Sequence, residues 1–211
     1  MTITIEPLEI IAADEGRYYT LAEFYAWLKQ NEDDVQYELI NGVIIEKDKS
    51  DSAGPSGRHG EIMSKLSFYL TAHSLPNNLG RVFTDAPFQF KDDIGTDEGS
   101  QKKRKSNCLI PDVSFVKAGR VPEVFNGPVP AIPDLVAEID SPSDSLERIG
   151  DKIEIYKQAR VGLIWSIFMQ DRYVVVQRAG SDDITLLNRE DELDGEDVLP
   201  GFKLKLPALF K

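Results

Sequence analysis

The sequence predicts a mixed α/β fold built on a central β-sheet, and two observations carry this prediction. Short apolar runs typical of buried strands occur at 109–116, 135–139 and 163–168. Apolar residues also recur every three or four positions, the spacing of an amphipathic helix, at 59–73 and 145–160. Because these strands and helices are interleaved along the chain, we expect helices packed against one sheet.

The bulk composition predicts one globular domain over residues 1–211, with its core at about 20–210. A net charge of −12 argues against a general nucleic-acid coat, because non-specific affinity comes from cations on phosphates. No apolar run approaches the roughly 18 residues of a membrane span, and no signal peptide is visible at the N-terminus. The single cysteine, Cys108, excludes an internal disulfide. We therefore expect a cytoplasmic protein that has no membrane partner.

A β-hairpin near the N-terminus is the strongest local signal. Residues 37–40 and 43–46 flank Asn41-Gly42, the dipeptide typical of a two-residue hairpin turn. In this register Glu38 lies opposite Ile45. Because side chains alternate across a strand, Glu38 is expected on the same face as its apolar neighbours and away from water.

The segments around the hairpin are predicted from capping and loop-forming residues. Thr20 with Glu23 has the spacing of a capping box and predicts a helix N-terminus. A strand is expected at 81–90. The polar stretch 91–107 predicts a mobile loop, and its basic cluster at 102–105 is more typical of a solvated loop than of a DNA contact.

The helix at 145–160 has sequence signals at both ends. Ser143 or Asp144 is expected to cap it, and Gly162 follows its end. Its buried stripe is predicted to consist of Leu146, Ile149, Ile153 and Tyr156. Apolar strands are expected next at 163–168 and 173–178.

Acidic residues stand in two of the predicted buried strands, Asp112 in one and Glu138 in the other. A buried carboxylate is costly unless it is paired or coordinates a metal, and divalent cations prefer hard oxygen ligands. Either acid alone could simply end its strand in water. Together they favour a site for Mg²⁺ or Mn²⁺, to which Glu38 would contribute directly or through water.

Lys152 is the cation that helical spacing brings closest to these acids. It borders the predicted stripe between Ile149 and Tyr156, so its stem could run along the helix toward the end of the sheet. There it could orient an attacking water and stabilise charge on a phosphate. A surface lysine paired with Asp151 or Glu147 is the alternative, and the spacing does not separate the two.

Several short motifs occur in an order that resembles a known family. They are YELING at 37–42, HG at 59–60, PDVSFV at 111–116, PDLVAEIDSPS at 133–143, KIEIY at 152–156, Trp165, and the tail LDGEDVLPGF at 193–202. Over about 20–210 the chain resembles the Uma-type putative restriction endonucleases. These were formerly a domain of unknown function and are grouped with the PD-(D/E)xK nucleases.

The resemblance implies a restriction-endonuclease-like fold with an N-terminal hairpin and metal-dependent cleavage of DNA. It assigns Asp112, Glu138 and Glu38 to the superfamily's acids. The pattern asks for a lysine two residues after the second acid, where this chain has Asp140. The resemblance suggests that Lys152, on the following helix, takes the place of that lysine.

Three functions remain open at this stage. A metal-dependent DNA nuclease is favoured by the retained acids and Lys152, and a homodimer would suit cutting of two strands. A non-catalytic relative that binds a protein or nucleic acid is favoured by Asp140 and the acidic balance. A hydrolase of smaller phosphate esters is the weakest of the three. His59, which opens a helix, is expected either at the rim of the cleft or as a helix-terminal packing residue.

Overall fold

A computed structural model describes residues 17–31, 34–47, 57–90, 106–141 and 146–211. Three expectations concern segments that lie wholly or mostly outside the described residues. These are the polar loop at 91–107, its basic cluster at 102–105, and the helix caps Ser143 and Asp144.

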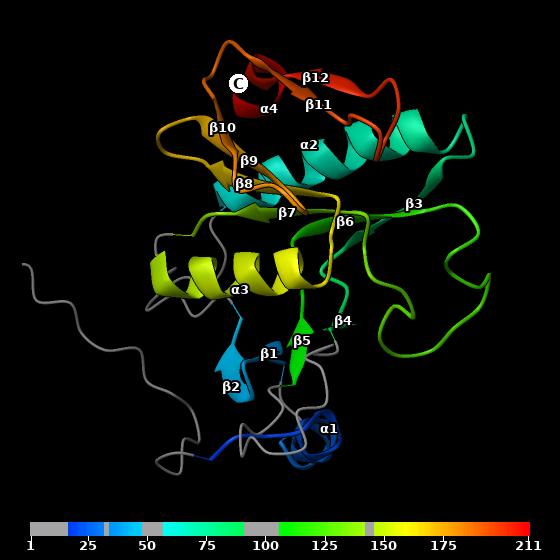
Figure 1. Ribbon diagram of the computed structural model, residues 1–211, viewed down its shortest axis with the longest axis vertical. Coiled ribbons are helices and arrows are strands. Elements are labelled where there is room, and N and C mark those ends of the chain that lie inside the picture. The colour runs from blue at the N-terminus through cyan, green and yellow to red at the C-terminus, as the bar shows by residue number, and fades with distance from the viewer. Residues whose placement is uncertain (1–16, 32–33, 48–56, 91–105, 142–145) are drawn as a thin grey trace, which may run out of the picture.

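A six-stranded mixed sheet forms the centre of the molecule, with the order β10-β9-β8-β7-β6-β3 (Figure 1). Its strands are β3 (Gly80–Thr84), β6 (Val113–Lys117), β7 (Leu135–Ile139), β8 (Leu163–Phe168), β9 (Tyr173–Arg178) and β10 (Ile184–Leu187). β7 and β8 pair in parallel and the other neighbours are antiparallel. A parallel pair requires a crossover, and helix α3 (Leu146–Gln158) provides it. The predicted mixed α/β architecture is confirmed.

A second, antiparallel sheet of four strands has the order β2-β1-β5-β4. It contains β1 (Tyr37–Ile40), β2 (Val43–Glu46), β4 (Phe88–Phe90) and β5 (Asn107–Leu109). The hairpin register is as predicted, with Ile40 opposite Val43 and Glu38 opposite Ile45. Both turn residues, Asn41 and Gly42, have positive φ, as this turn requires.

Two predicted strands are wrong because each is divided between the sheets. The run at 81–90 is β3 in the large sheet and β4 in the small one, separated by Asp85 at φ +47°. The run at 109–116 is likewise broken between β5 and β6 at Pro111, which has no N–H to donate to a ladder. Asp112 therefore lies in a link between the sheets and not inside a strand.

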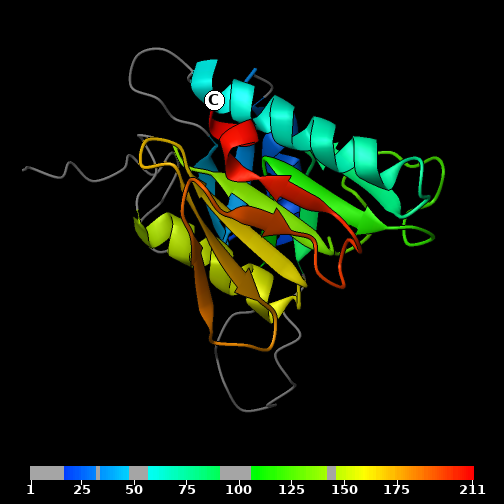
Figure 2. The same ribbon diagram turned by 90° about the horizontal axis from the view of Figure 1, so that it is seen from above.

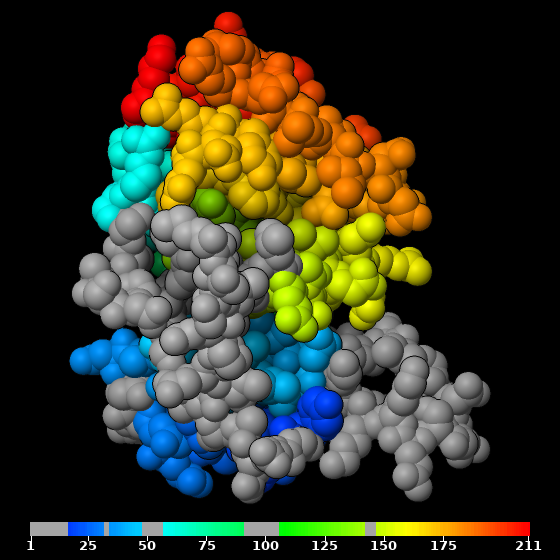
Figure 3. Space-filling model, turned by 90° about the vertical axis from the view of Figure 1, so that its left-hand side faces the viewer, coloured from blue at the N-terminus to red at the C-terminus, as the bar shows by residue number. Residues whose placement is uncertain are grey.

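Helices cover both faces of the large sheet. On one face lie α2 (Gly57–Ser74), α4 (Leu206–Phe210) and the ribbon of β11 (Glu192–Asp194) and β12 (Lys203–Lys205), and α3 lies on the other (Figures 1 and 2). Figure 3 shows α1 (Leu21–Gln30) and the β1–β2 hairpin, in blue, at the opposite end of the molecule from the C-terminal segments, in orange and red. The predicted capping box of α1 is present, with both Thr20 and Glu23 bonded.

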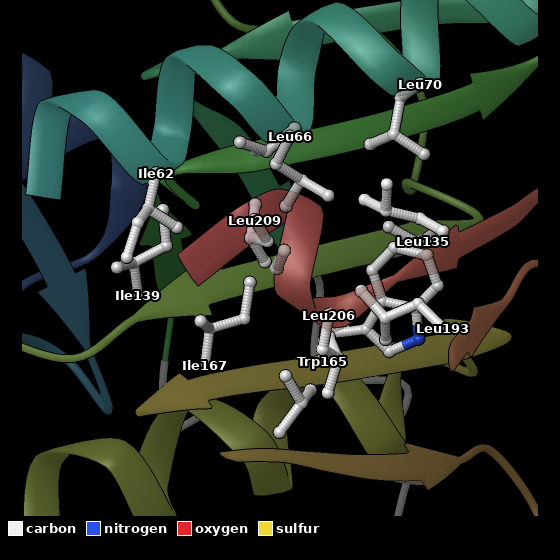
Figure 4. Close-up of a cluster of buried hydrophobic side chains, with 14 of the residues drawn as sticks. Ile62, Leu66, Leu70, Leu135, Ile139, Trp165, Ile167, Leu193, Leu206 and Leu209 are labelled. Atoms are coloured by element: carbon white, nitrogen blue, oxygen red, sulfur yellow. The ribbon is translucent and has the colours of Figure 1, made fainter. Parts of the chain in front are cut away.

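Alternation along the central strands separates two cores and sets the direction of Glu138. Ala137 and Trp165 belong to the core beneath α2, where Ile62 and Leu66 also pack (Figure 4). Val136 belongs to the second core, together with Tyr156 of α3 and residues of the small sheet. Glu138 is two residues after Val136, so its side chain points to the α3 side.

The buried side of α3 is more polar than predicted. Tyr156 is fully buried, as expected, but Ile149 and Ile153 are only partly buried, and the side chain of Leu146 is not among those described. Arg148 and Lys152 are buried in addition. The helix thus turns two cations toward the sheet, and this is possible because carboxylates lie there to meet them.

Candidate active site

Four predicted residues converge where α3 and the small sheet meet the end of β7. Glu38 comes from β1, Asp112 from the link before β6, Glu138 from β7 and Lys152 from α3. Lys152 Nζ lies 2.7 Å from Glu138 Oε2 and 3.1 Å from Glu38 Oε1, and the residue is only 6% exposed. The alternative of a surface lysine is therefore wrong.

Glu38 is fully buried and held by three donors. Its Oε1 also accepts the Ile110 N–H at 2.7 Å, and Arg148 Nη2 lies 2.9 Å from its Oε2. Burial alone would raise the pKa of this carboxyl, but the charges of Lys152 and Arg148 outweigh it and hold the pKa below its ordinary value. Glu38 is thus a carboxylate whose charge is compensated within the protein.

Asp112 is also buried and is bonded through both oxygens. Oδ2 accepts the Ile139 N–H at 2.7 Å and lies 3.3 Å from His59 Nε2, while Oδ1 lies 3.1 Å from Lys47 Nζ. Burial raises the pKa of Asp112, but the His59 hydrogen bond and the Lys47 charge overcome this and keep it well below its usual range. Lys47 binds Asp85 as well, so one ammonium joins two carboxylates.

Glu138 differs from the other two acids because its pKa is raised, to about 7. Burial is the main cause; the charge of Lys152 opposes it, and the charges of Asp112 and Glu38 add to it. Its Oε1 accepts a hydrogen bond from the Tyr156 hydroxyl. Burial lowers the pKa of Lys152, but the charges of Glu138, Glu38 and Asp112 more than reverse this, so the ammonium remains protonated.

The model of the family described as Uma2, putative restriction endonuclease, matches residues 21–207. The chain belongs to the Uma2 family. No functionally curated protein shows significant sequence similarity to it. None of the helices within the described segments is long and apolar enough to cross a membrane.

The Uma2 fold is also seen in a crystal structure of a putative nuclease belonging to DUF820 from Anabaena variabilis ATCC 29413. The two structures superpose with a TM-score of 0.71 at 23% sequence identity, over 90% of this chain and 97% of the other. At this identity the likeness shows the fold. The expected restriction-endonuclease-like fold is therefore confirmed.

Four residues of this Uma2 site were not assigned a role in it from the sequence. Arg148 and Tyr156 stand four residues before and after Lys152, so i, i+4 spacing on α3 was a usable signal. His59 is not at a rim: it is buried in the first turn of α2, and its Nε2 also lies 3.3 Å from Asp112 Oδ2. Lys47 follows β2 and lies 65 residues before Asp112, and no local pattern identifies it.

Asp140 has a structural place in this Uma2 chain. Its Oδ1 accepts the Met169 N–H at 2.6 Å, and its own N–H donates to the Ile167 carbonyl at 2.9 Å. These bonds tie the end of β7 to the end of β8. The residue that stands where the superfamily pattern has lysine therefore fastens the parallel pair.

The predicted metal set stays a prediction, and only the donor chemistry can be compared with it. Asp112 and Glu138 offer the hard oxygen ligands that Mg²⁺ and Mn²⁺ prefer. All three carboxylates accept bonds from the protein, so a metal ion would have to displace Lys47 from Asp112 or Lys152 from Glu138. Glu38 fits a direct ligand role least, because it is fully buried and held by three donors. In the described part of the chain no three His, Cys, Asp or Glu side chains are grouped closely enough to hold a metal ion. Asp112 and Glu138, which are less deeply buried than Glu38, are therefore the better-fitting donors.

Proposed function

We propose that the protein is a metal-dependent nuclease that hydrolyses DNA phosphodiester bonds. One observation carries the proposal: the buried ammonium of Lys152 is held by Glu38 and Glu138. Burying a cation costs free energy. A buried ammonium at the end of a sheet suits a site where negative charge develops on a phosphate during the reaction. The Uma2 match points to the same class of reaction.

Each side chain has a role that follows from its contacts. Asp112 and Glu138 would hold Mg²⁺ or Mn²⁺, which supplies a Lewis acid for the phosphoryl oxygen and acidifies a water. Lys152 stabilises charge on the phosphate. Glu38 is fully buried and positions Lys152 through their 3.1 Å contact, and Arg148 in turn holds Glu38. Tyr156 orients the Glu138 carboxylate through its hydroxyl.

Hydrolysis then requires one bond exchange at phosphorus. The water oxygen forms a new P–O bond, the ester P–O bond breaks with its electron pair, and the leaving oxygen takes a proton. The buried charges of Glu38, Asp112 and Lys152 are held in place by their ion pairs. They would therefore need no rearrangement during this step.

Plasmid cleavage in Mg²⁺ or Mn²⁺ tests the function. We expect the wild type to cut, EDTA to stop cleavage, and Asp112→Asn to lose about 100-fold or more in rate. Asp182→Asn serves as the control, since Asp182 is fully exposed and belongs to a surface ion pair. A wild type that cuts no DNA with either metal would overturn the proposal. A small phosphodiester tested as a parallel substrate would reveal a hydrolase of smaller phosphate esters.

A non-catalytic binding protein is the second candidate, and one observation favours it. The three carboxylates are matched within the protein by Lys47, Arg148 and Lys152, so the cluster is stable without an added ion. Calorimetric titration with Mn²⁺ separates the two candidate functions, because a non-catalytic binding protein of this kind would bind no metal. A two-fold dimer stays a prediction, to be checked by sedimentation equilibrium.

A further inference from the structure

A small cavity lies beside Glu138 and Lys152, and the hydroxyl of Ser166 in its wall has no evident bonding partner in the described part of the chain. The cavity has a volume of about 30 Å³ and is lined in part by Glu138, Lys152 and Ser166. Ser166 lies on β8, directly opposite Glu138 in the parallel register. It is 4% exposed, and within the described segments its Oγ has no hydrogen-bond partner.

A buried hydroxyl without a partner requires a physical explanation, because most buried polar atoms in proteins are bonded to protein or to water. A water molecule needs roughly 10–15 Å³ and two to four polar partners. The cavity exceeds that volume, and Glu138 and Lys152 offer an acceptor and a donor beside Ser166 Oγ. Size and chemistry both fit a water.

We propose that Ser166 holds a water molecule in this cavity against Glu138, and that this water is the nucleophile. The second clause rests on the proposed nuclease function. The Ser166 hydroxyl and the Glu138 carboxylate would fix the direction of the water's lone pair. As the water oxygen bonds to phosphorus, the ester P–O bond breaks with its electron pair onto the leaving oxygen, and the water's proton passes to solvent.

Ser114 provides a matched control for this inference. It is also a fully buried serine on a central strand, β6, and its Oγ too lacks a partner among the described residues. It does not line the cavity beside Glu138. Truncation of either serine removes a buried, unpartnered hydroxyl, but only truncation of Ser166 should affect a water in that cavity.

Crystal structures of the wild type, Ser166→Ala and Ser114→Ala test the water site directly. We expect an ordered water within hydrogen-bond distance of Ser166 Oγ in the wild type and in Ser114→Ala, and its loss or displacement in Ser166→Ala. A dry cavity in the wild type, or an unmoved water in Ser166→Ala, would overturn the inference.

Steady-state cleavage tests the role of that water. Ser166→Ala should lower kcat at least 10-fold with KM for DNA unchanged, whereas Ser114→Ala should keep the wild-type kcat. An active wild type with full kcat in Ser166→Ala would overturn the role. A wild type that cuts nothing would overturn the proposed function and the nucleophile with it, while the crystal structures would still decide whether Ser166 holds a water.

Discussion

At the scale of single residues, the candidate active site is held together by buried carboxylates that are paired with buried cations. Glu38 is fully buried and depends on Arg148 and Lys152 for compensation. Breaking a buried pair by removing one partner is far more costly than the pair's net worth, because a charge is left uncompensated. Removing one member of the network that positions Lys152 should therefore cost much more stability than the intact network contributes.

Arg148→Met should destabilise the protein by about 3 kcal/mol, because it leaves Glu38 with less compensation while keeping a side chain of similar length. Urea denaturation of both proteins measures the cost. Arg189→Met is the control, since the Arg189–Glu190 pair is well exposed and should contribute little. Equal effects of the two substitutions would show that the buried pair is not important for stability.

Cys108 gives a pH-dependent prediction outside the cluster. Burial raises the pKa of its thiol from 9.0 to about 11, against the opposing hydrogen bond with Tyr25. The native thiolate fraction at pH 8 falls about 100-fold, so alkylation should be at least that much slower than in urea. By linkage, the raised pKa contributes stability below pH 9 that is lost as pH rises through 11, and Cys108→Ala should remove this part of the decline. Equal alkylation rates in both states would contradict the assignment.

At the scale of elements, the β7–α3–β8 unit builds the site. The parallel pair places Glu138 beside Ser166, and the crossover helix lays Arg148, Lys152 and Tyr156 over them. Two glycines of this unit, Gly150 within α3 and Gly162 directly before β8, have opposite surroundings. A Cβ at Gly150 would meet nothing within 4 Å, whereas one at Gly162 would lie 2.7 Å from Val198 Cγ2.

Gly150→Ala should stabilise the protein by about 0.5–1 kcal/mol, because alanine favours the helix and has open space. Gly162→Ala should destabilise it by about 1–3 kcal/mol, since the tight contact forces the tail segment to shift. Thermal or urea unfolding of both variants measures the two effects. The same sign for both would mean that close approach at Gly162 does not constrain the unit.

Local elements were predictable from the sequence, and their division between sheets was not. The Asn41-Gly42 turn and the Thr20 capping box follow from neighbouring residues alone, and both are present. The breaks near Asp85 and Pro111 depend on which sheet each half joins, which no local periodicity encodes. Glu38, Asp112, Glu138 and Lys152 were selected from strand and helix patterns together with the family motifs. The Lys47 contact joins residues too distant in sequence for a spacing rule.

At the scale of the whole molecule, the two sheets close around the acids. Asp112 lies in the link between the sheets, Glu38 comes from the small sheet and Glu138 from the large one. Anything that binds this junction should stabilise the entire fold by mass action. A metal ion bound at this junction, as proposed, would therefore add to global stability.

Saturating Mn²⁺ should raise the unfolding free energy by about 3 kcal/mol at a free concentration 100 times Kd, and EDTA should reverse this. Asp112→Asn should lose the metal-induced increase. Lys47→Met should enlarge it, because Lys47 competes for Asp112 Oδ1. Unfolding curves with and without Mn²⁺ measure the difference, and an increase that survives in Asp112→Asn would place the metal elsewhere.

The most direct test of the central claim is plasmid cleavage by the wild type, Lys152→Ala and Lys157→Ala, each first shown to be folded by circular dichroism. Both lysines are on α3, but Lys152 bridges Glu38 and Glu138, while Lys157 pairs with the exposed Asp182. The account predicts that Lys152→Ala abolishes metal-dependent cleavage and that Lys157→Ala cuts as the wild type does. Cleavage by Lys152→Ala at the wild-type rate would contradict the account.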